Sequence, residues 1–314
     1  MAIATLTLNP ALDVTTCTEK VRPGHKLRCS PPRFDPGGGG INVARVVTHL
    51  GGDATAVFPS GGPAGATIVQ LLEAQKIPIL PVPIARATRE SFTVDEGRPG
   101  DQYRFVLPGP ELNEDEQAAL IDALFGVADV THVVVSGSLP PGCDPAIFQR
   151  IGARCREAGV KLVIDTSGPA LAACEGAGAW LIKPSLREVA DLLGREIAGE
   201  ADEMAAAQEL QRRGFGEVVV VSLAERGALL VGEGKVLRVP AIPVEAQGTV
   251  GAGDSMVAAI TLASSQGKGI EDALRYGIAA GAATLMTPAT ELARKEDVER
   301  LYAASVSLTD ASVR

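Results

Sequence analysis

From residue 113 onward, short apolar runs alternate with amphipathic segments, and this alternation restricts the fold more than any other feature of the chain. The predicted strands are Val130–Ser136, Lys161–Asp165, Trp180–Lys183, Glu217–Ser222, Gly227–Val231 and Val236–Val239, and the predicted helices cover about 114–124, 145–158, 185–193 and 202–213 and begin near 167, 253, 270 and 295. Strands that alternate with such helices form a mostly parallel sheet covered on both faces. The chain is therefore predicted to have an α/β fold.

The N-terminal part of the chain adds further strand–helix units. Strand Ile3–Leu8 precedes helix Ile41–Leu50, and strand Ala54–Phe58 precedes a helix near 65–75. These units continue the same architecture, so we expect one domain over residues 1–314.

A second pattern interrupts these units. The runs Ser91–Asp95 and Gln102–Val106 alternate polar and apolar residues and flank a Gly-Arg-Pro-Gly turn, which is a hairpin signature. With the run Leu27–Phe34, this hairpin predicts a small antiparallel sheet that projects from the main domain. Such a sheet exposes one face unless it covers a site or a partner chain. We expect a discontinuous β lid formed by about 14–34 and 88–107.

Charge and cysteine content exclude several classes of function. The formal net charge is −9 with no basic run, which argues against nucleic acid or an anionic membrane as partner. Five cysteines without C-x-x-C spacing indicate reduced thiols in a cytoplasmic protein. The three histidines are scattered, which argues against a transition-metal site built from protein ligands alone. The start lacks a signal-peptide pattern, and no apolar run reaches about 18 residues. A phosphorylated substrate would need local positive charge in this acidic protein.

Polar side chains fall where several predicted strands end. These residues are Asp13, Ser138, Asp165, Lys183 and Ser222. Ligands of parallel sheets bind beyond the carboxyl ends of the strands. The sequence therefore predicts a single cleft at this edge.

The stretch Thr249–Ser255 is a glycine-rich turn that runs directly into an apolar helix. Small residues let backbone N–H groups converge, and the helix start adds about half a positive charge, so the turn suits an anion. Asp254 cannot hold a phosphate itself, but it is placed to take a proton from a hydroxyl that attacks a phosphoryl group. An acidic residue that only complements the helix dipole explains the pattern equally well.

A second glycine run, Gly37–Gly40, stands between a predicted strand and a helix. Close approach of the backbone to a ligand explains it better than a flexible linker. Asn42, in the first helical turn, has a carboxamide suited to sugar hydroxyls or to local capping. Four cations on or near the predicted lid, Lys26, Arg28, Arg89 and Arg104, are either solvated strand charges or partners of a phosphate.

The segment Lys183–Glu188 supports two interpretations. Ser185 and Glu188 have the S-x-x-E spacing of a capping box, which needs no ligand. Alternatively, Lys183 lies near nucleotide phosphates and Glu188 faces Mg²⁺ through water, since Mg²⁺ retains several waters. The two interpretations use different atoms and are compatible. Neither a P-loop motif nor a G-x-G-x-x-G after the first strand is present.

Two motifs resemble those of the ribokinase-like PfkB family of sugar kinases. They are Asp35-Pro36-Gly37-Gly38-Gly39-Gly40-Ile41-Asn42-Val43-Ala44-Arg45 and Gly248-Thr249-Val250-Gly251-Ala252-Gly253-Asp254-Ser255. Within the family, the segments 26–29, 102–106, 112–116 and 135–142 are most similar to bacterial minor 6-phosphofructokinases. The resemblance covers about residues 3–302. It implies a ribokinase-like three-layer sandwich with a mostly parallel central sheet and a small β-sheet lid.

The resemblance also implies an activity and a set of site residues. It implies ATP-dependent phosphorylation of fructose 6-phosphate at its 1-hydroxyl, a step of glycolysis, with Mg²⁺ and in some members a monovalent cation such as K⁺. Asp254 would be the base, with N–H groups of Gly251, Ala252 and Gly253 as the anion hole. The sugar would contact Asp13, Gly38, Gly39, Asn42 and Ser138, and its phosphate Lys26, Arg89 and Arg104. The nucleotide site would contain Lys183, Ser185, Ser222, Leu223, Gly227 and Thr249, with Glu188 reaching the metal through water.

Other activities fit the same motifs, and this chain differs from the family pattern at one position. The family usually has N-x-x-E where this chain has Ser185 and Glu188, which changes the water network expected around Mg²⁺. 1-Phosphofructokinase and tagatose-6-phosphate kinase would share the base and anion hole. A sugar-phosphate or nucleotide sensor without catalysis is the alternative of another class, although Asp254 and its flanking glycines are intact. The family's lid commonly forms a dimer interface, so a homodimer through the β lid is implied.

Overall fold

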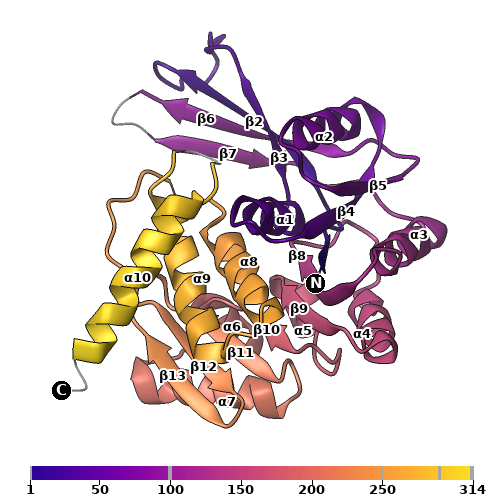
Figure 1. The fold of residues 1–314 in the computed structure, drawn as a ribbon. Helices are drawn as coiled ribbons and strands as arrows, with labels where there is room; N and C mark the ends of the chain where they lie inside the picture. The colour runs from indigo at the N-terminus through magenta and orange to yellow at the C-terminus, as the bar shows by residue number, and fades with distance from the viewer. Residues whose placement is uncertain (1, 98–100, 249, 289–290, 312–314) are drawn as a thin grey trace.

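A nine-stranded sheet forms the centre of the protein in the computed structural model, which describes residues 2–97, 101–248, 250–288 and 291–311 (Figure 1). Its strand order is β13 (Lys235–Val239), β12 (Ala228–Gly232), β11 (Val218–Ser222), β10 (Leu181–Ile182), β9 (Lys161–Asp165), β8 (Val130–Ser136), β1 (Ala2–Leu6), β4 (Ala54–Ser60) and β5 (Ile79–Pro83). All neighbours from β11 to β5 are parallel, and β12 and β13 add an antiparallel hairpin at one edge. The predicted mostly parallel α/β sheet is confirmed.

Helices cover both faces of this sheet. One layer contains α1 (Gly39–His49), α2 (Gly62–Ala74), α8 (Ala252–Ser265), α9 (Ile270–Leu285) and α10 (Lys295–Ala311), and the other contains α3 (Glu114–Phe125), α4 (Ile147–Ala158), α5 (Gly168–Ala172), α6 (Leu186–Leu193) and α7 (Gly199–Arg212). In β11, Val218 and Val220 join the first core and Val219 and Val221 the second, so both faces of the strand are buried. This explains its continuous apolar run. The predicted three-layer sandwich is confirmed.

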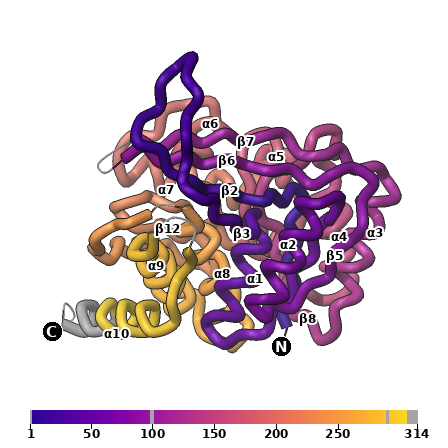
Figure 2. The backbone as a smooth tube through the Cα atoms, turned by 90° about the horizontal axis from the view of Figure 1, so that it is seen from above, coloured from indigo at the N-terminus to yellow at the C-terminus, as the bar shows by residue number. Residues whose placement is uncertain are grey.

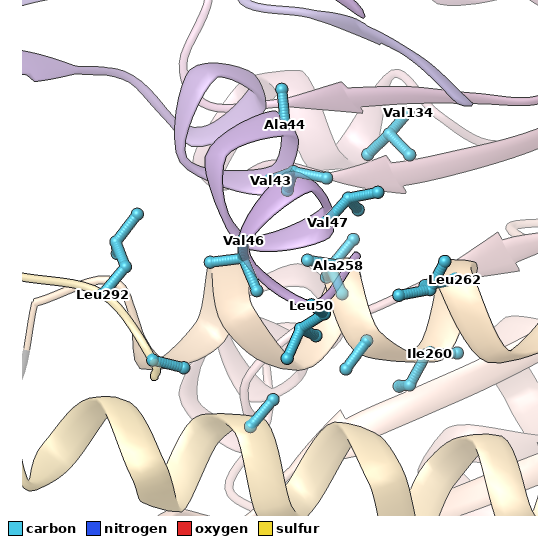
Figure 3. Close-up of a cluster of buried hydrophobic side chains, with 14 of the residues drawn as sticks. Val43, Ala44, Val46, Val47, Leu50, Val134, Ala258, Ile260, Leu262 and Leu292 are labelled. Atoms are coloured by element: carbon cyan, nitrogen blue, oxygen red, sulfur yellow. The ribbon is translucent and has the colours of Figure 1, made fainter. Parts of the chain in front are cut away.

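Helices α1 and α8 pack side by side in the first core. Val46, Val47 and Leu50 of α1 lie close to Ala258 and Leu262 of α8 (Figure 3). Both helices begin at the edge where the parallel strands end. The same packing therefore brings the first turns of α1 and α8 together, although they are far apart in the sequence.

The small sheet contains β3 (Arg33–Gly37), β2 (Ala11–Thr18), β6 (Arg89–Glu96) and β7 (Gln102–Val106) and projects above the main body (Figure 1). Two details of its prediction are wrong. The run Leu27–Phe34 is not a strand, because Pro31 and Pro32 lack the N–H groups that a ladder needs, and β3 begins only at Arg33. The sheet is also mixed, since β2 and β6 pair in parallel. Among the described residues, no helix has the length and apolar character to cross a bilayer.

A buried histidine lies near the amino-terminal end of β8. The His132 ring nitrogens are 3.0 Å and 3.2 Å from the hydroxyl oxygens of Thr131 and Ser264, and Trp180 packs against its ring. Burial, and the nearby positive charge of Lys161, lower the pKa of His132 to about 4. The folded protein therefore keeps this ring neutral in mild acid.

Acidification from pH 6.5 to pH 4 is expected to lower the free energy of unfolding by about 3 kcal/mol through His132 alone. Between pH 6.5 and pH 4, the His132 ring binds a proton in the unfolded chain but stays neutral in the folded protein. Above pH 6.5 the ring is neutral in both states, and below pH 4 it is protonated in both. Urea unfolding across this range should show a smaller acid loss in His132→Gln than in the wild type. An equal loss in both proteins would contradict the assignment.

Candidate active site

The first turn of α8 presents unpaired backbone donors. Gly251, the residue before the helix, has φ = 82°, a conformation that glycine adopts without strain, and no side chain of the described residues caps the helix start. The helix continues through Ala252, Gly253 and Asp254. The first N–H groups of a helix lack intrahelical partners and carry partial positive charge. This turn can therefore receive an anion. Thr249 lies outside the described residues.

Asp254 is held in this turn by groups from two other elements. Its Oδ2 accepts a hydrogen bond of 2.9 Å from Nδ2 of Asn42 in the first turn of α1, and its Oδ1 is 3.4 Å from the Ser136 hydroxyl at the end of β8. Burial and the nearby Asp165 carboxylate raise the pKa of Asp254 to about 7, against the hydrogen bond from Asn42 and the charge of Lys183. A carboxyl group with this pKa can exchange a proton near neutral pH.

The glycines at the start of α1 allow this helix to contact the strand ends directly. A Cβ on Gly39 would overlap the Ser136 side chain and lie 2.9 Å from the backbone nitrogen of Gly137. A Cβ on Gly40 would lie 2.6 Å from the carbonyl oxygen of Leu6, and Gly38 has φ = 130°. In the main sheet, the strand that follows β1 is β4, on one side, and the strand that follows β8 is β9, on the other side. The contact between α1 and the ends of β1 and β8 therefore lies at the switch point of the strand order, where such sheets bind ligands.

The small sheet brings Asp13 and two of the predicted cations to this edge. Burial raises the pKa of Asp13 to about 6, and the charges of Arg89 and Arg104 oppose that rise. Arg89 donates to the carbonyl oxygens of Asn9 and Leu107 at 3.1 Å and 3.0 Å. Its buried Nε has no hydrogen-bond partner among the described residues. Arg89 can therefore donate to a ligand.

The remaining predicted sugar-side residues are more peripheral. Ser138 is exposed, and its hydroxyl accepts a hydrogen bond of 3.1 Å from Nδ2 of Asn9. Lys26 is exposed in the segment between β2 and β3, which extends away from the main body (Figure 2). The structure does not bring Lys26 into the group around Asp13.

A cavity of about 1110 Å³ lies on the other side of the α8 start. Ser185, Ser222, Leu223 and Gly227, all predicted for a nucleotide site, line it, and it extends to Ala252 and Gly253. Its remaining wall is mostly small and apolar, formed by Ala241, Ile242, Pro243, Val244, Ala246, Ile278, Gly281 and Ala282, among others. The apolar wall suits a flat ring, and the helix start suits an attached phosphate chain.

Lys183 and Glu188 lie close to this cavity, Lys183 in an ion pair with Asp165 and Glu188 in hydrogen bonds with Ser185. Lys183 is 6% exposed, and its Nζ is 3.1 Å from Oδ1 of Asp165. Burial acts to lower the pKa of Lys183, but Asp165, Glu188 and Asp254 outweigh it and hold the pKa above its usual value. The predicted capping box is present, with Glu188 Oε2 accepting from the Ser185 N–H at 2.7 Å. This bond uses one of the two carboxylate oxygens of Glu188.

Sequence reasoning did not single out several residues of this site. Ser136 beside Asp254, Asn9 beside Ser138 and Arg45 beside Asn42 were not identified. Nor were the α9 residues of the cavity wall, Ile278 among them. Ser136 was the easiest to detect, because it ends a predicted strand two residues before Ser138.

Comparison with known proteins identifies the family. The model of the "pfkB family carbohydrate kinase" matches residues 7–296. The chain belongs to the PfkB family. The predicted resemblance is therefore confirmed.

Individual PfkB proteins are similar along nearly the whole chain. The protein is 49% identical over 309 residues to the ATP-dependent 6-phosphofructokinase isozyme 2 of Mycobacterium tuberculosis, covering 98% of this chain and 91% of the relative. It is 42% identical to the isozyme 2 of Escherichia coli, covering 96% and 98%. The crystal structure of Escherichia coli phosphofructokinase-2 in complex with potassium matches with a TM-score of 0.92 at 42% identity, covering 97% and 99%. A 1-phosphofructokinase of Haloferax volcanii is 35% identical, covering 94% and 95%.

Proposed function

We propose that the protein is an ATP-dependent 6-phosphofructokinase that transfers the terminal phosphoryl group of ATP to the 1-hydroxyl of fructose 6-phosphate. One observation carries the proposal: Asp254 lies at the start of α8, between the Asn42 side of the site and the large cavity. A base there can take the hydroxyl proton while the helix start stabilises the phosphoryl group. The names of the Mycobacterium tuberculosis and Escherichia coli relatives support fructose 6-phosphate as acceptor.

The sugar-phosphate side of the proposal uses the group under the small sheet. Asp13 and Asn42 would bind sugar hydroxyls, with the backbone of Gly38 and Gly39 beside them. Arg89 and Arg104 would bind the existing phosphate, for which the unpartnered Nε of Arg89 supplies a donor. Lys26 and Ser138 stay predictions for this subsite. Positive charge here offsets the acidic character of the whole chain.

The nucleotide side uses the cavity and the residues behind it. The adenine ring would lie against the apolar wall, with the phosphates directed to Gly253 and toward Lys183. Among the described residues, no cluster of three His, Cys, Asp or Glu side chains could hold a metal alone. Mg²⁺ would be carried on the nucleotide phosphates, with the other carboxylate oxygen of Glu188 reaching it through water. When bound, Mg²⁺ neutralises phosphate charge.

The proposal extends to assembly and location. Among the described residues, three aromatic side chains that share one face of the small sheet are exposed: Phe34, Phe92 and Phe105, with Phe105 the most exposed at 55%. An exposed apolar patch of this kind marks a partner surface. A homodimer through this sheet would cover the patch, and its mass in solution would be twice the 32.4 kDa chain mass. The proposed location is the cytoplasm.

A coupled ADP-release assay with three sugars tests the proposal. Fructose 6-phosphate, fructose 1-phosphate and tagatose 6-phosphate are each supplied with ATP and Mg²⁺, with and without K⁺. The highest kcat/KM is expected for fructose 6-phosphate. A preference for either other sugar would assign the enzyme to 1-phosphofructokinases or tagatose-6-phosphate kinases. Tight sugar-phosphate binding without ADP release would indicate a sensor instead.

Arg104→Ala is expected to raise KM for fructose 6-phosphate more than KM for unphosphorylated fructose, by about 10-fold or more for the phosphorylated sugar. The guanidinium of Arg104 interacts with Asp13 through its charge and is exposed enough to reach a bound phosphate. Steady-state kinetics with both sugars measure the difference. Arg212→Ala, at an exposed position on α7, is the control. An equal rise for both sugars would refute the phosphate role.

A further inference from the structure

Arg45 is a buried cation on α1 that the proposed reaction does not yet use. It lies one helical turn after Asn42 and is only 6% exposed. Buried charges are retained only where other groups satisfy them. The contacts of Arg45 therefore show what this charge is for.

The guanidinium of Arg45 joins two side-chain amides. Its Nη1 donates to Oδ1 of Asn42 at 3.2 Å, and its Nε donates to Oε1 of Gln75 at 2.9 Å. Gln75 follows the last residue of α2, so Arg45 ties α2 to the first turn of α1. The planar guanidinium presents its donors in fixed directions, which an ammonium group does not.

These contacts determine the orientation of the Asn42 carboxamide. An arginine side chain offers only donors, so the oxygen of the carboxamide must face Arg45. Its nitrogen then faces Asp254, to whose Oδ2 it donates at 2.9 Å. In the opposite orientation, Asn42 would direct an oxygen at the carboxylate and an N–H at the guanidinium. Both contacts would be repulsive.

The environment of Arg45 also contains two carboxylates. The charges of Asp13 and Asp35 act on its guanidinium, and Asp13 and Asp35 face each other across β2 and β3. Arg45 thus supplies a fixed positive charge beneath the proposed sugar subsite. Because its side chain is buried, Arg45 acts on this subsite through its charge and its hydrogen bonds to other side chains.

We infer that Arg45 is a positioning residue that holds Asn42 in the one orientation that donates to the base, so that the Asp254 carboxylate is aimed at the sugar hydroxyl. This role rests on the proposed function. It is a role in kcat, because the orientation of the base matters in the transition state. It predicts little effect on ATP binding, because Arg45 does not line the large cavity.

A double-mutant cycle of Arg45→Met and Asn42→Ala tests the inference. Arg45→Met is expected to lower kcat about 10- to 100-fold with KM for ATP almost unchanged, since misplaced reacting groups lose about this much. In the Asn42→Ala background, the same substitution should cost about twofold or less, because its target is gone. An equal loss in both backgrounds, or a loss mainly in KM for ATP, would overturn the role.

Two further variants separate positioning from folding. Gln75→Leu removes the other partner of the guanidinium but leaves the Asn42 contact, so kcat should stay within about threefold of the wild type. A loss as large as that of Arg45→Met would indicate general disruption and overturn the role. If Arg45→Met does not fold, Arg45→Lys, which keeps the charge facing Asp13 and Asp35, takes its place in the cycle. A wild-type kcat in Arg45→Lys would also overturn the role.

The cycle distinguishes this inference from the proposed function. If the wild type prefers another sugar of the three, the proposed substrate is wrong, and the cycle is run with that sugar. If the wild type transfers no phosphoryl group to any of them, the proposed function and the role of Arg45 both fail. An active wild type with additive variants overturns the role of Arg45 alone.

Discussion

Replacing Asp254 with asparagine is expected to lower kcat by about 10²- to 10⁴-fold, the range typical of losing a general base. Asparagine keeps the shape of the side chain but cannot accept the hydroxyl proton. The nucleotide cavity and the start of α8 are unchanged, so KM for ATP and for the sugar phosphate should change little. Steady-state ADP release measures both constants.

A control variant and a stability measurement exclude other causes of a lower kcat. Asp122→Asn changes an exposed carboxylate on α3, remote from the site, and should retain wild-type kinetics. Thermal unfolding of Asp254→Asn should show a protein at least as stable as the wild type, because a partly buried charge has been removed. Turnover near the wild-type rate in Asp254→Asn would remove Asp254 from the mechanism.

Lys183→Met is expected to lower the free energy of unfolding by about 3 to 5 kcal/mol. The ammonium group of Lys183 is buried beside Asp165, with 3.1 Å between Nζ and Oδ1. Its removal leaves the Asp165 carboxylate buried without its partner. Chemical denaturation of the variant and the wild type at pH 7 measures the loss.

The double variant Lys183→Met/Asp165→Leu should recover most of that stability, since replacing a buried ion pair by apolar residues is often neutral. Lys235→Met, at an exposed position on β13, is the matched control and should lie within about 0.5 kcal/mol of the wild type. A loss in Lys183→Met no larger than in Lys235→Met would mean that the pair does not stabilise the fold. So would a double variant as unstable as the single one.

The strands were most predictable where they are buried on both faces. Val130–Ser136 and Lys161–Asp165 have the predicted bounds, because each contains three consecutive apolar residues that are followed by a polar one. The edge strand Ile79–Pro83 was not singled out, since Pro81 and Pro83 are typical of strand edges and breaks. The parallel pairing of β2 and β6 could not be predicted from local pattern, because it depends on a connection through α2 and β5.

The site was predictable where chemistry and spacing coincide. The capping box of Ser185 and Glu188 has the expected reciprocal bonds of 2.7 Å and 3.2 Å, because both partners lie within one helical turn. The hydrogen bond between Asn42 and Asp254 spans 212 positions and could not be read from spacing. It arises from the packing of α1 on α8. The cavity residues of α9, such as Ile278, have the composition of ordinary core, so only the fold reveals them.

A crystal structure of the protein with fructose 6-phosphate and a non-hydrolysable ATP analogue would show whether Asp254 is placed to act as the base. A carboxylate oxygen of Asp254 is expected within about 2.6 to 3.2 Å of the sugar 1-hydroxyl. That hydroxyl should be in line with the terminal phosphate, which receives N–H groups at the start of α8. An Asp254 side chain turned away from the hydroxyl, with the sugar phosphate remote from Arg89 and Arg104, would rule out the proposed roles of these three residues.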